Sequence, residues 1–247
     1  NVKTRRIEGV VALIRWRDPE AGLISPAAFI PLLESTGLIV EVGDWVLERA
    51  ALDCRQWRHD GLPPVRIAVN ISPVQLRRPD FLSRFTKLTG SWASSNCGLD
   101  VEITEGTLID DSDATLRKLE RLRAAGARIA IDDFGTGYSS LSRLADLPID
   151  TLKIDRSFVS RLRPDDRSGR TLVQTIISLA RSFNMTVVAE GVETVEQLGL
   201  LWEMDCDQSQ GYLHSRPVAC AELVELLRSA RDGIIRVPES ATPRGSC

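Results

Sequence analysis

The chain has 247 residues, of which 43% are hydrophobic and 26% charged, with a formal net charge of −3. This length and composition are typical of one large globular domain, within the range of a single α/β barrel. The weak net charge and the lack of a long Lys/Arg run argue against general binding of DNA or RNA, so a phosphate-bearing ligand would need a dedicated site.

Cysteine and histidine usage narrows the chemistry further. The five cysteines are scattered without C-x-x-C spacing, which argues against a disulfide framework or a zinc ribbon and predicts a cytoplasmic setting, whether or not a longer parent protein is anchored to a membrane. Only two histidines occur, His59 and His214. No apolar run approaches the roughly 18 residues of a membrane-spanning helix. Aspartate and glutamate carboxylates are therefore the main candidates for catalytic or metal-binding groups.

Seven short β-type runs alternate along the chain with segments of helical periodicity. The strands are expected at 10–15, 65–70, 101–104, 129–132, 151–154, 186–189 and 211–213. Helix signals fall between them, such as Ser25 before Pro26 and a capping box formed by Thr194 and Gln197. This alternation predicts an α/β fold with a parallel sheet and crossover helices.

An eight-stranded barrel would need one strand more than the seven predicted. The chain opens on a segment that resembles a turn, so we expect the first strand to precede residue 1. From about residue 232 onward, Pro, Gly, Ser and Thr replace the periodic pattern, which is typical of a tail or linker. The predicted organisation is thus one domain at 1–231 and a tail at 232–247.

Polar side chains gather at the predicted strand ends, where a βα barrel carries its active site. They are Arg15, Asn70, Glu102, Asp132 with Asp133, Lys153 with Asp155, Glu190 and Gln210. Any one of them alone could be a strand-end cap or half of a surface ion pair. As a set, however, unpaired carboxylates would each lose several kcal/mol of solvation or more, so their convergence calls for cations. Oxygen ligands without His or Cys favour Mg²⁺, Mn²⁺ or Ca²⁺, and paired ions suit displacement at phosphorus.

Lys153 is notable because the chain holds 27 Arg but only four Lys. A lysine on a strand of the predicted barrel suggests that a compact ammonium group is needed there, although chance placement is the alternative.

Eight motifs in one order and spacing resemble the EAL domain family. They are VALIRW (11–16), FIPLLESTGLI (29–39), VNIS (69–72), EITE (102–105), DDFGTGYSSL (132–141), KID (153–155), AEGVET (189–194) and QGYLHSRP (210–217). The resemblance covers roughly residues 5 to 230. The DFG triplet is also similar to one in protein kinases, but the glycine-rich loop, the V-A-I-K strand and the H-R-D loop of kinases are lacking.

The resemblance implies a modified TIM barrel whose first strand is antiparallel, and that strand is the one that we find missing. It also implies hydrolysis of cyclic di-GMP to pGpG with two Mg²⁺ or Mn²⁺ ions, and inhibition by Ca²⁺. On the matching positions, one ion would take Asn70, Glu102 and Asp132, and the other would take Asp132, Asp133 and Glu190. Lys153 would position the attacking water or stabilise the developing charge, with Asp155 hydrogen-bonded nearby.

The same resemblance assigns ligand contacts and partners. Arg15 would hold a phosphate of cyclic di-GMP, and Leu13 and Gln210 would lie against the nucleotide. Glu105 and Glu193 would anchor the DFGTGYSS loop, which in the family couples the metal site to a homodimer. Further domains are expected in a longer parent protein.

The chain departs from the family at Val11, where the EAL motif has its metal-binding Glu. Strand alternation predicts that residues 11, 13 and 15 share one face, and valine offers no ligand atom there. Three hypotheses stay open. The chain is a phosphodiesterase with weakened activity, a cyclic di-GMP receptor that does not hydrolyse its ligand, or an interaction module that needs no nucleotide.

Overall fold

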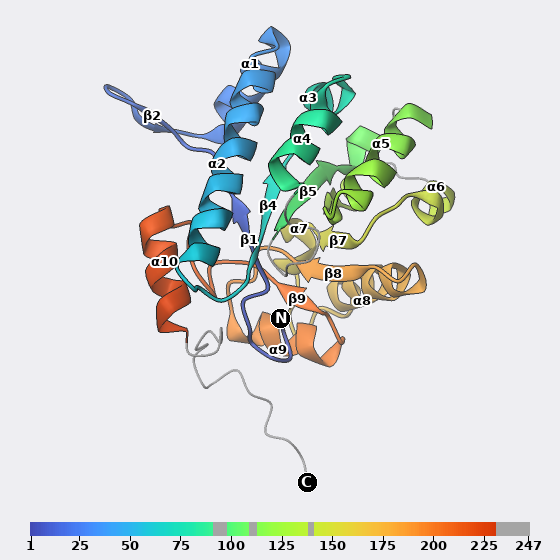
Figure 1. The fold of residues 1–247 in the computed structure, drawn as a ribbon. Helices are drawn as coiled ribbons and strands as arrows, with labels where there is room; N and C mark the ends of the chain where they lie inside the picture. The colour runs from blue at the N-terminus through green and yellow to red at the C-terminus, as the bar shows by residue number, and fades with distance from the viewer. Residues whose placement is uncertain (91–97, 109–112, 138–140, 231–247) are drawn as a thin grey trace. The chain divides into compact units, whose positions relative to one another are not determined.

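The computed structural model describes residues 1–90, 98–108, 113–137 and 141–230 (Figure 1). It divides into two compact units, which we describe separately. The first comprises residues 9–103 and 107–129, and the second comprises 1–8, 104–106 and 130–247. The predicted tail at 232–247 lies outside the described residues.

The first unit contains three parallel strands, a hairpin and helices that cover the strands. The parallel strands adjoin in the order β1 (Gly9–Ala12), β4 (Arg66–Asn70) and β5 (Gly98–Thr104), and β2 (Trp16–Asp18) pairs antiparallel with β3 (Gly22–Ile24). The helices are α1 (Pro26–Thr36), α2 (Ile39–His59), α3 (Pro73–Arg77), α4 (Phe81–Thr89) and α5 (Asp113–Ala124). Helix α2 lies beside β4 and buries one face that includes Leu47, Cys54 and Trp57. This apolar face of α2 thus forms part of the core of the unit.

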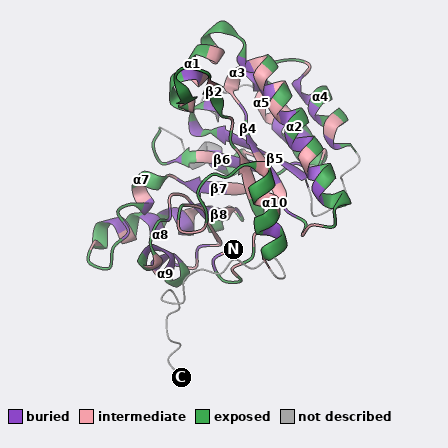
Figure 2. Ribbon diagram, turned by 90° about the vertical axis from the view of Figure 1, so that its left-hand side faces the viewer, coloured by how far each residue is buried: buried purple, intermediate pink, exposed green. Residues whose placement is uncertain are grey.

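The second unit repeats the strand–helix alternation. Its parallel strands adjoin in the order β6 (Ile129–Phe134), β7 (Thr151–Ile154), β8 (Thr186–Ala189) and β9 (Gln208–Ser209). The helices are α6 (Leu141–Asp146), α7 (Arg156–Val159), α8 (Arg167–Ser182), α9 (Val195–Glu203) and α10 (Cys220–Ser229), and a short 3₁₀ turn, η1 (Glu105–Leu108), follows β5. Strands β7 and β8 are largely buried, as Figure 2 shows, and α8 covers them. The predicted capping box of Thr194 and Gln197 is present at the start of α9.

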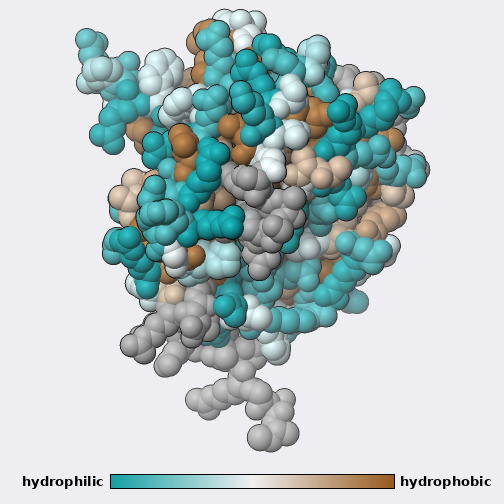
Figure 3. All heavy atoms as spheres, in the orientation of Figure 1, coloured by the Kyte–Doolittle hydropathy of each residue, from teal (hydrophilic) through white to brown (hydrophobic). Residues whose placement is uncertain are grey.

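On the face shown in Figure 3, hydrophilic side chains predominate and apolar ones are scattered among them. Among the described residues, no single helix is both long and apolar enough to cross a membrane. Helices α1 and α2 pass that test only as a pair, and the pair is bent by 118°.

The structure corrects two predicted strands. The first, expected at 10–15, ends at Ala12, because Trp16 already pairs with Ile24 in the β2–β3 hairpin. Residues 13 and 15 lie outside this strand. The prediction that residues 11, 13 and 15 share one strand face therefore holds for none beyond Val11. The last, expected at 211–213, is wrong: the strand lies at Gln208–Ser209, and residues 211–213 form a turn.

Gly211 explains why this segment turns. Its backbone approaches residue 192 so closely that a β-carbon at position 211 would lie 2.2 Å from the Val192 carbonyl oxygen. Beyond the turn, the Leu213 N–H donates to the same oxygen at 3.0 Å. Only a residue without a side chain fits this contact.

Gly211→Ala is therefore expected to destabilise the protein by about 1–3 kcal/mol, the usual cost of overpacking a filled site. Gly199→Ala is the matched control, because a β-carbon there meets nothing within 4 Å and lies inside α9. In that helix, alanine should stabilise by about 0.5–1 kcal/mol. Urea unfolding of both variants measures the difference, and equal effects would contradict the close approach at Gly211.

Candidate functional site

Near its end, strand β6 carries two consecutive aspartates, Asp132 and Asp133, whose carboxylates lie close together. The pairing of β6 with β7 shifts register between Ile131 and Phe134, and Asp133 adopts a left-handed backbone with φ of 52°. In a regular strand the two side chains would point to opposite faces. The bulge instead brings both carboxylates together, and Asp132 Oδ1 accepts a hydrogen bond from the Asp133 N–H at 3.1 Å.

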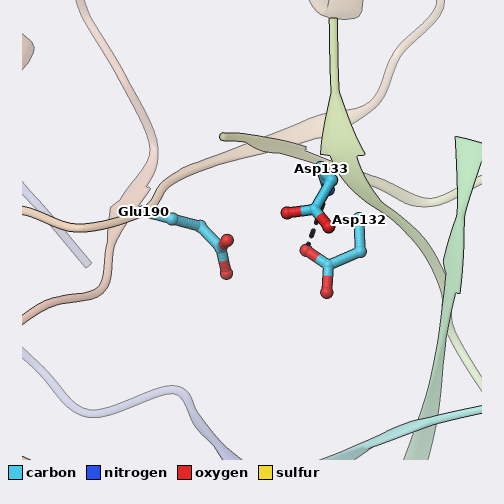
Figure 4. A group of neighbouring side chains, drawn as sticks. All are labelled: Asp132, Asp133 and Glu190. Atoms are coloured by element: carbon cyan, nitrogen blue, oxygen red, sulfur yellow. Dashed lines mark hydrogen bonds between the residues drawn. The ribbon is translucent and has the colours of Figure 1, made fainter. Parts of the chain in front are cut away.

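Glu190, directly after β8, completes an acidic cluster. Its carboxylate faces those of Asp132 and Asp133, and one oxygen from each of the three lies within 4.8 Å of the others (Figure 4). All three donors are carboxylate oxygens, which suit a hard divalent cation. The residues therefore fit a Mg²⁺ or Mn²⁺ ion.

Lys153 on β7 lies between two members of this cluster. Its Nζ is 3.0 Å from Asp132 Oδ1 and 2.8 Å from Glu190 Oε1, and only 4% of its side chain is exposed. Because β7 is flanked by β6 and β8, the parallel order of the strands places the ammonium between their two ends. A buried lysine is costly without partners, and these two carboxylates compensate its charge.

The cluster carries more negative charge than this one lysine neutralises. Burial raises the pKa of Glu190, Lys153 opposes that rise, and Asp132 adds to it. The pKa of Asp133 is also raised, first by burial and then by the charges of Asp132 and Asp155. Raised carboxyl pKa values in one place indicate a site that a bound cation would stabilise.

Asp155 lies next to the cluster at the start of α7. Its Oδ1 accepts a hydrogen bond from the Ser157 N–H at 3.0 Å and so caps the helix. Burial acts to raise the pKa of Asp155, but hydrogen bonds from the Ser157 side chain and backbone lower it overall. It is thus held as a carboxylate, and it interacts with Asp133.

In the first unit, Asn70 at the end of β4 is in register with Glu102, two residues before the end of β5. Asn70 Nδ2 donates to Glu102 Oε2 at 3.3 Å, and Glu102 is only 3% exposed. Val11 on β1 is in register with Ala68, two residues before Asn70 on β4. Alternation along β4 therefore puts Val11 on the same sheet face as Asn70 and Glu102.

The three residues predicted to contact the nucleotide are Leu13, Arg15 and Gln210, and they differ in exposure and in hydrogen bonding. Leu13 is 46% exposed, and the exposed Arg15 donates from Nη1 to the neighbouring Ile14 carbonyl at 2.8 Å. Gln210 follows β9, and its backbone N–H donates to the Ala189 carbonyl at 2.8 Å. Glu190 follows Ala189 directly. This backbone hydrogen bond therefore holds Gln210 next to the segment that carries Glu190.

Glu105 contacts the glycine-rich loop that follows β6. Its carboxylate is buried, and Oε2 accepts from the Gly135 N–H at 3.1 Å and from the Gly137 N–H at 3.3 Å. Tyr138, Ser139 and Ser140 of the loop lie outside the described residues. Glu193 is exposed beside the start of α9, so its role as a second anchor stays a prediction.

Glu105→Ala is expected to cost about 1–3 kcal/mol of stability, because two backbone amides lose their acceptor. Glu105→Gln keeps one side-chain oxygen and should retain part of that stability. Hydrogen exchange of peptides that contain Gly135 and Gly137 should accelerate in the alanine variant and less in the glutamine variant. Unchanged exchange in both would contradict the anchoring role.

Sequence reasoning missed the bulge that brings Asp132 and Asp133 together. A signal for it exists, because aspartate tolerates the left-handed conformation better than most residues and a glycine follows two residues later. The signal is weak in isolation, since consecutive aspartates also occur in ordinary turns.

An α/β fold with a carboxylate cluster at the ends of parallel strands defines a candidate metal-binding protein. The EAL domain family model matches residues 1–217, and the chain belongs to that family. The predicted family membership is confirmed.

Relatives and solved structures agree with this assignment. The cyclic di-GMP phosphodiesterase NbdA of Pseudomonas aeruginosa is 44% identical over 220 residues, which are 89% of this chain and 28% of that protein. The structure of the PaMucR phosphodiesterase in complex with c-di-GMP is 43% identical, with a TM-score of 0.81 over 87% of each chain. The EAL enzyme Bd1971, bound to cAMP and cyclic-di-GMP, is 33% identical, with a TM-score of 0.84 over 92% of this chain and 62% of that one.

These similarities confirm the predicted TIM-barrel-type α/β fold of the family. The chain spans between 27% and 38% of the length of the curated relatives that it matches, so those relatives are multidomain proteins.

Proposed function

We propose that this chain is the EAL domain of a multidomain signalling protein, that it binds cyclic di-GMP, and that it hydrolyses this ligand to pGpG at a rate lowered by Val11. The observation that carries the proposal is the cluster of Asp132, Asp133 and Glu190, braced by Lys153, in a chain of the EAL family. Relatives with 39% and 44% identity are named cyclic di-GMP phosphodiesterases.

The donor set supports two divalent cations, Mg²⁺ or Mn²⁺, with Ca²⁺ as an inhibitor. Asp132, Asp133 and Glu190 would hold one ion, and family resemblance assigns Asn70 and Glu102 to the other, with Asp132 shared. Bound divalent cations supply Lewis-acid activation of the phosphate and of an attacking water. Val11 provides no ligand atom where the family has Glu, so the ion at Asn70 and Glu102 would be held more weakly.

The chain's own side chains would orient the reactants and balance charge. Lys153 pairs with the carboxylates of Asp132 and Glu190. Its ammonium would also stabilise the negative charge that develops on the phosphate during hydrolysis. Asp155, which interacts with Asp133, would help to hold that carboxylate in place. Arg15 would pair with a phosphate of the nucleotide, while Leu13 and Gln210 would contact its bases or ribose.

Two further assignments belong to the proposal. The DFGTGYSS loop, anchored at Glu105, would contribute to a homodimer, and the domain would work in the cytoplasm next to other domains of its parent.

The proposal is tested by measuring turnover and binding on the full-length protein. With Mn²⁺, chromatography should detect slow formation of pGpG, and with Ca²⁺ cyclic di-GMP should bind saturably without turnover. Asp132→Asn should remove turnover in Mn²⁺. Saturable binding without any pGpG would favour the non-hydrolysing receptor, which the valine at position 11 specifically allows. If cyclic di-GMP does not bind even at high micromolar concentration, both the phosphodiesterase and the receptor hypotheses are contradicted, and an interaction module is favoured.

A further inference from the structure

The turn after β9 is bonded along its length to the segment that carries Glu190. Strand β9 pairs with β8 in the register Val188 with Gln208 and Ala189 with Ser209. Beyond the strands, the Gln210 N–H donates to the Ala189 carbonyl at 2.8 Å, the Val192 N–H donates to the Gln210 carbonyl at 3.0 Å, and the Leu213 N–H donates to the Val192 carbonyl at 3.0 Å. Residues 189–192 and 210–213 are thus joined by three backbone hydrogen bonds.

The close approach of Gly211 to Val192 tightens this connection. A β-carbon at Gly211 would lie 2.2 Å from the Val192 oxygen and 2.3 Å from the Val192 nitrogen. The preceding residue, Gly191, has φ of 69°, and a β-carbon there would lie 2.6 Å from the Arg156 β-carbon. The backbone that follows Glu190 is therefore in close contact with both the first residue of α7 and the Gln210 turn, so a displacement of the turn would displace it.

One side-chain pair closes this turn. Ser209 Oγ lies 2.9 Å from His214 Nε2, so the bond spans Gln210 and Gly211, and the His214 N–H donates to the Gly211 carbonyl at 3.1 Å. Both residues are partly buried. Burial lowers the pKa of His214, which keeps the imidazole neutral at neutral pH. Either tautomer of a neutral imidazole can hydrogen-bond a hydroxyl, so the pair holds the turn regardless of which nitrogen carries the proton.

We infer that Ser209 and His214 are positioning residues that fix the Gln210 turn against the Glu190 segment, so that the nucleotide contact and the acidic cluster keep one relative arrangement. The inference rests on the proposed function in one respect, namely that Gln210 contacts cyclic di-GMP. Neither residue touches the ligand or an ion in this role. Their effect passes through the three backbone hydrogen bonds between 189–192 and 210–213.

Three variants of the full-length protein separate this role from a general structural one. Ser209→Ala and His214→Ala remove the bond, whereas His214→Gln keeps an amide at the place of Nε2. Loss of one hydrogen bond of ordinary strength should weaken binding of cyclic di-GMP in Ca²⁺ by about three- to tenfold. In Mn²⁺, KM should rise by a similar factor while kcat changes less. His214→Gln should return both values to within about twofold of the parent.

Hydrogen exchange provides a readout that does not depend on the ligand. Peptides that contain Val192 and Leu213 should exchange faster in Ser209→Ala and His214→Ala, and at the parental rate in His214→Gln. If the parent binds no cyclic di-GMP, the proposed function fails, while the exchange data still test whether the pair fixes the turn. If the parent binds and the variants bind equally well, the positioning role is overturned, whether or not exchange changes.

Discussion

Val11→Glu should raise pGpG production in Mg²⁺ or Mn²⁺ by a factor between about ten and a thousand. Valine at this position lies in register with Ala68, on the sheet face that carries Asn70 and Glu102. A glutamate there would add a carboxylate ligand to that group. A carboxylate in a hard-metal site is worth a few kcal/mol, and 1.4 kcal/mol corresponds to a tenfold change in occupancy.

The same substitution should have the opposite effect on the metal-free protein. Glu102 is only 3% exposed, so a second carboxylate on its sheet face adds repulsion that no added cation offsets. In EDTA, Val11→Glu should therefore have a lower melting temperature than the parent. Addition of Mn²⁺ should raise the melting temperature of Val11→Glu by more than that of the parent. Val11→Gln is the matched control, because it has the same size as Glu without its charge and should recover only part of the activity. Equal turnover in parent and Val11→Glu would mean that the ion does not need a ligand from this position.

Lys153→Met should reduce turnover by about 10² to 10³-fold, which is the usual effect of removing one group that stabilises developing charge. It should also destabilise the metal-free protein by about 3–5 kcal/mol, because Asp132 and Glu190 would lose the ammonium that lies 3.0 and 2.8 Å away. Mn²⁺ should restore part of that stability, since a bound cation replaces the lost positive charge.

The stability loss should depend on pH. Burial already raises the pKa of Glu190, and Lys153 is the charge that opposes the rise, so its removal would raise this pKa further. A carboxyl group with a raised pKa in the folded state favours folding only while it is protonated, and that contribution is lost as the pH rises. Lys153→Met should therefore be more destabilising at pH 8 than at pH 5 when each is compared with the parent.

Lys3→Met is the control for removing a lysine, because Lys3 pairs with Asp205 at the surface. It should leave turnover unchanged and alter stability by less than about 1 kcal/mol. A Lys153→Met protein with parental turnover would contradict the role given to the ammonium.

Much of the fold could be predicted from sequence where local signals are strong. The strands at 151–154 and 186–189 match β7 and β8 in both bounds, because each is a short run rich in apolar and β-branched residues. The family resemblance was equally clear, since eight motifs occur in order. These features depend on residues close together in the chain.

The residue at which a strand ends could not be predicted, because it depends on which segment pairs with which. The first strand ends at Ala12 because the following segment pairs within its own hairpin, and the last strand lies at Gln208–Ser209 because Gly211 turns against Val192. Neither partner is visible in the local pattern.

The sequence by itself determined the family, the oxygen-only donor set and the departure at Val11, because residue identities and their order are sufficient for these. Only the tertiary structure decided how the donors meet. A bulge and a left-handed Asp133 turn two consecutive carboxylates to one side, and the order of β6, β7 and β8 places Lys153 between Asp132 and Glu190. The physical reason is that alternation along a single strand predicts opposite directions for neighbouring residues, whereas the register with the adjacent strand sets where each side chain points.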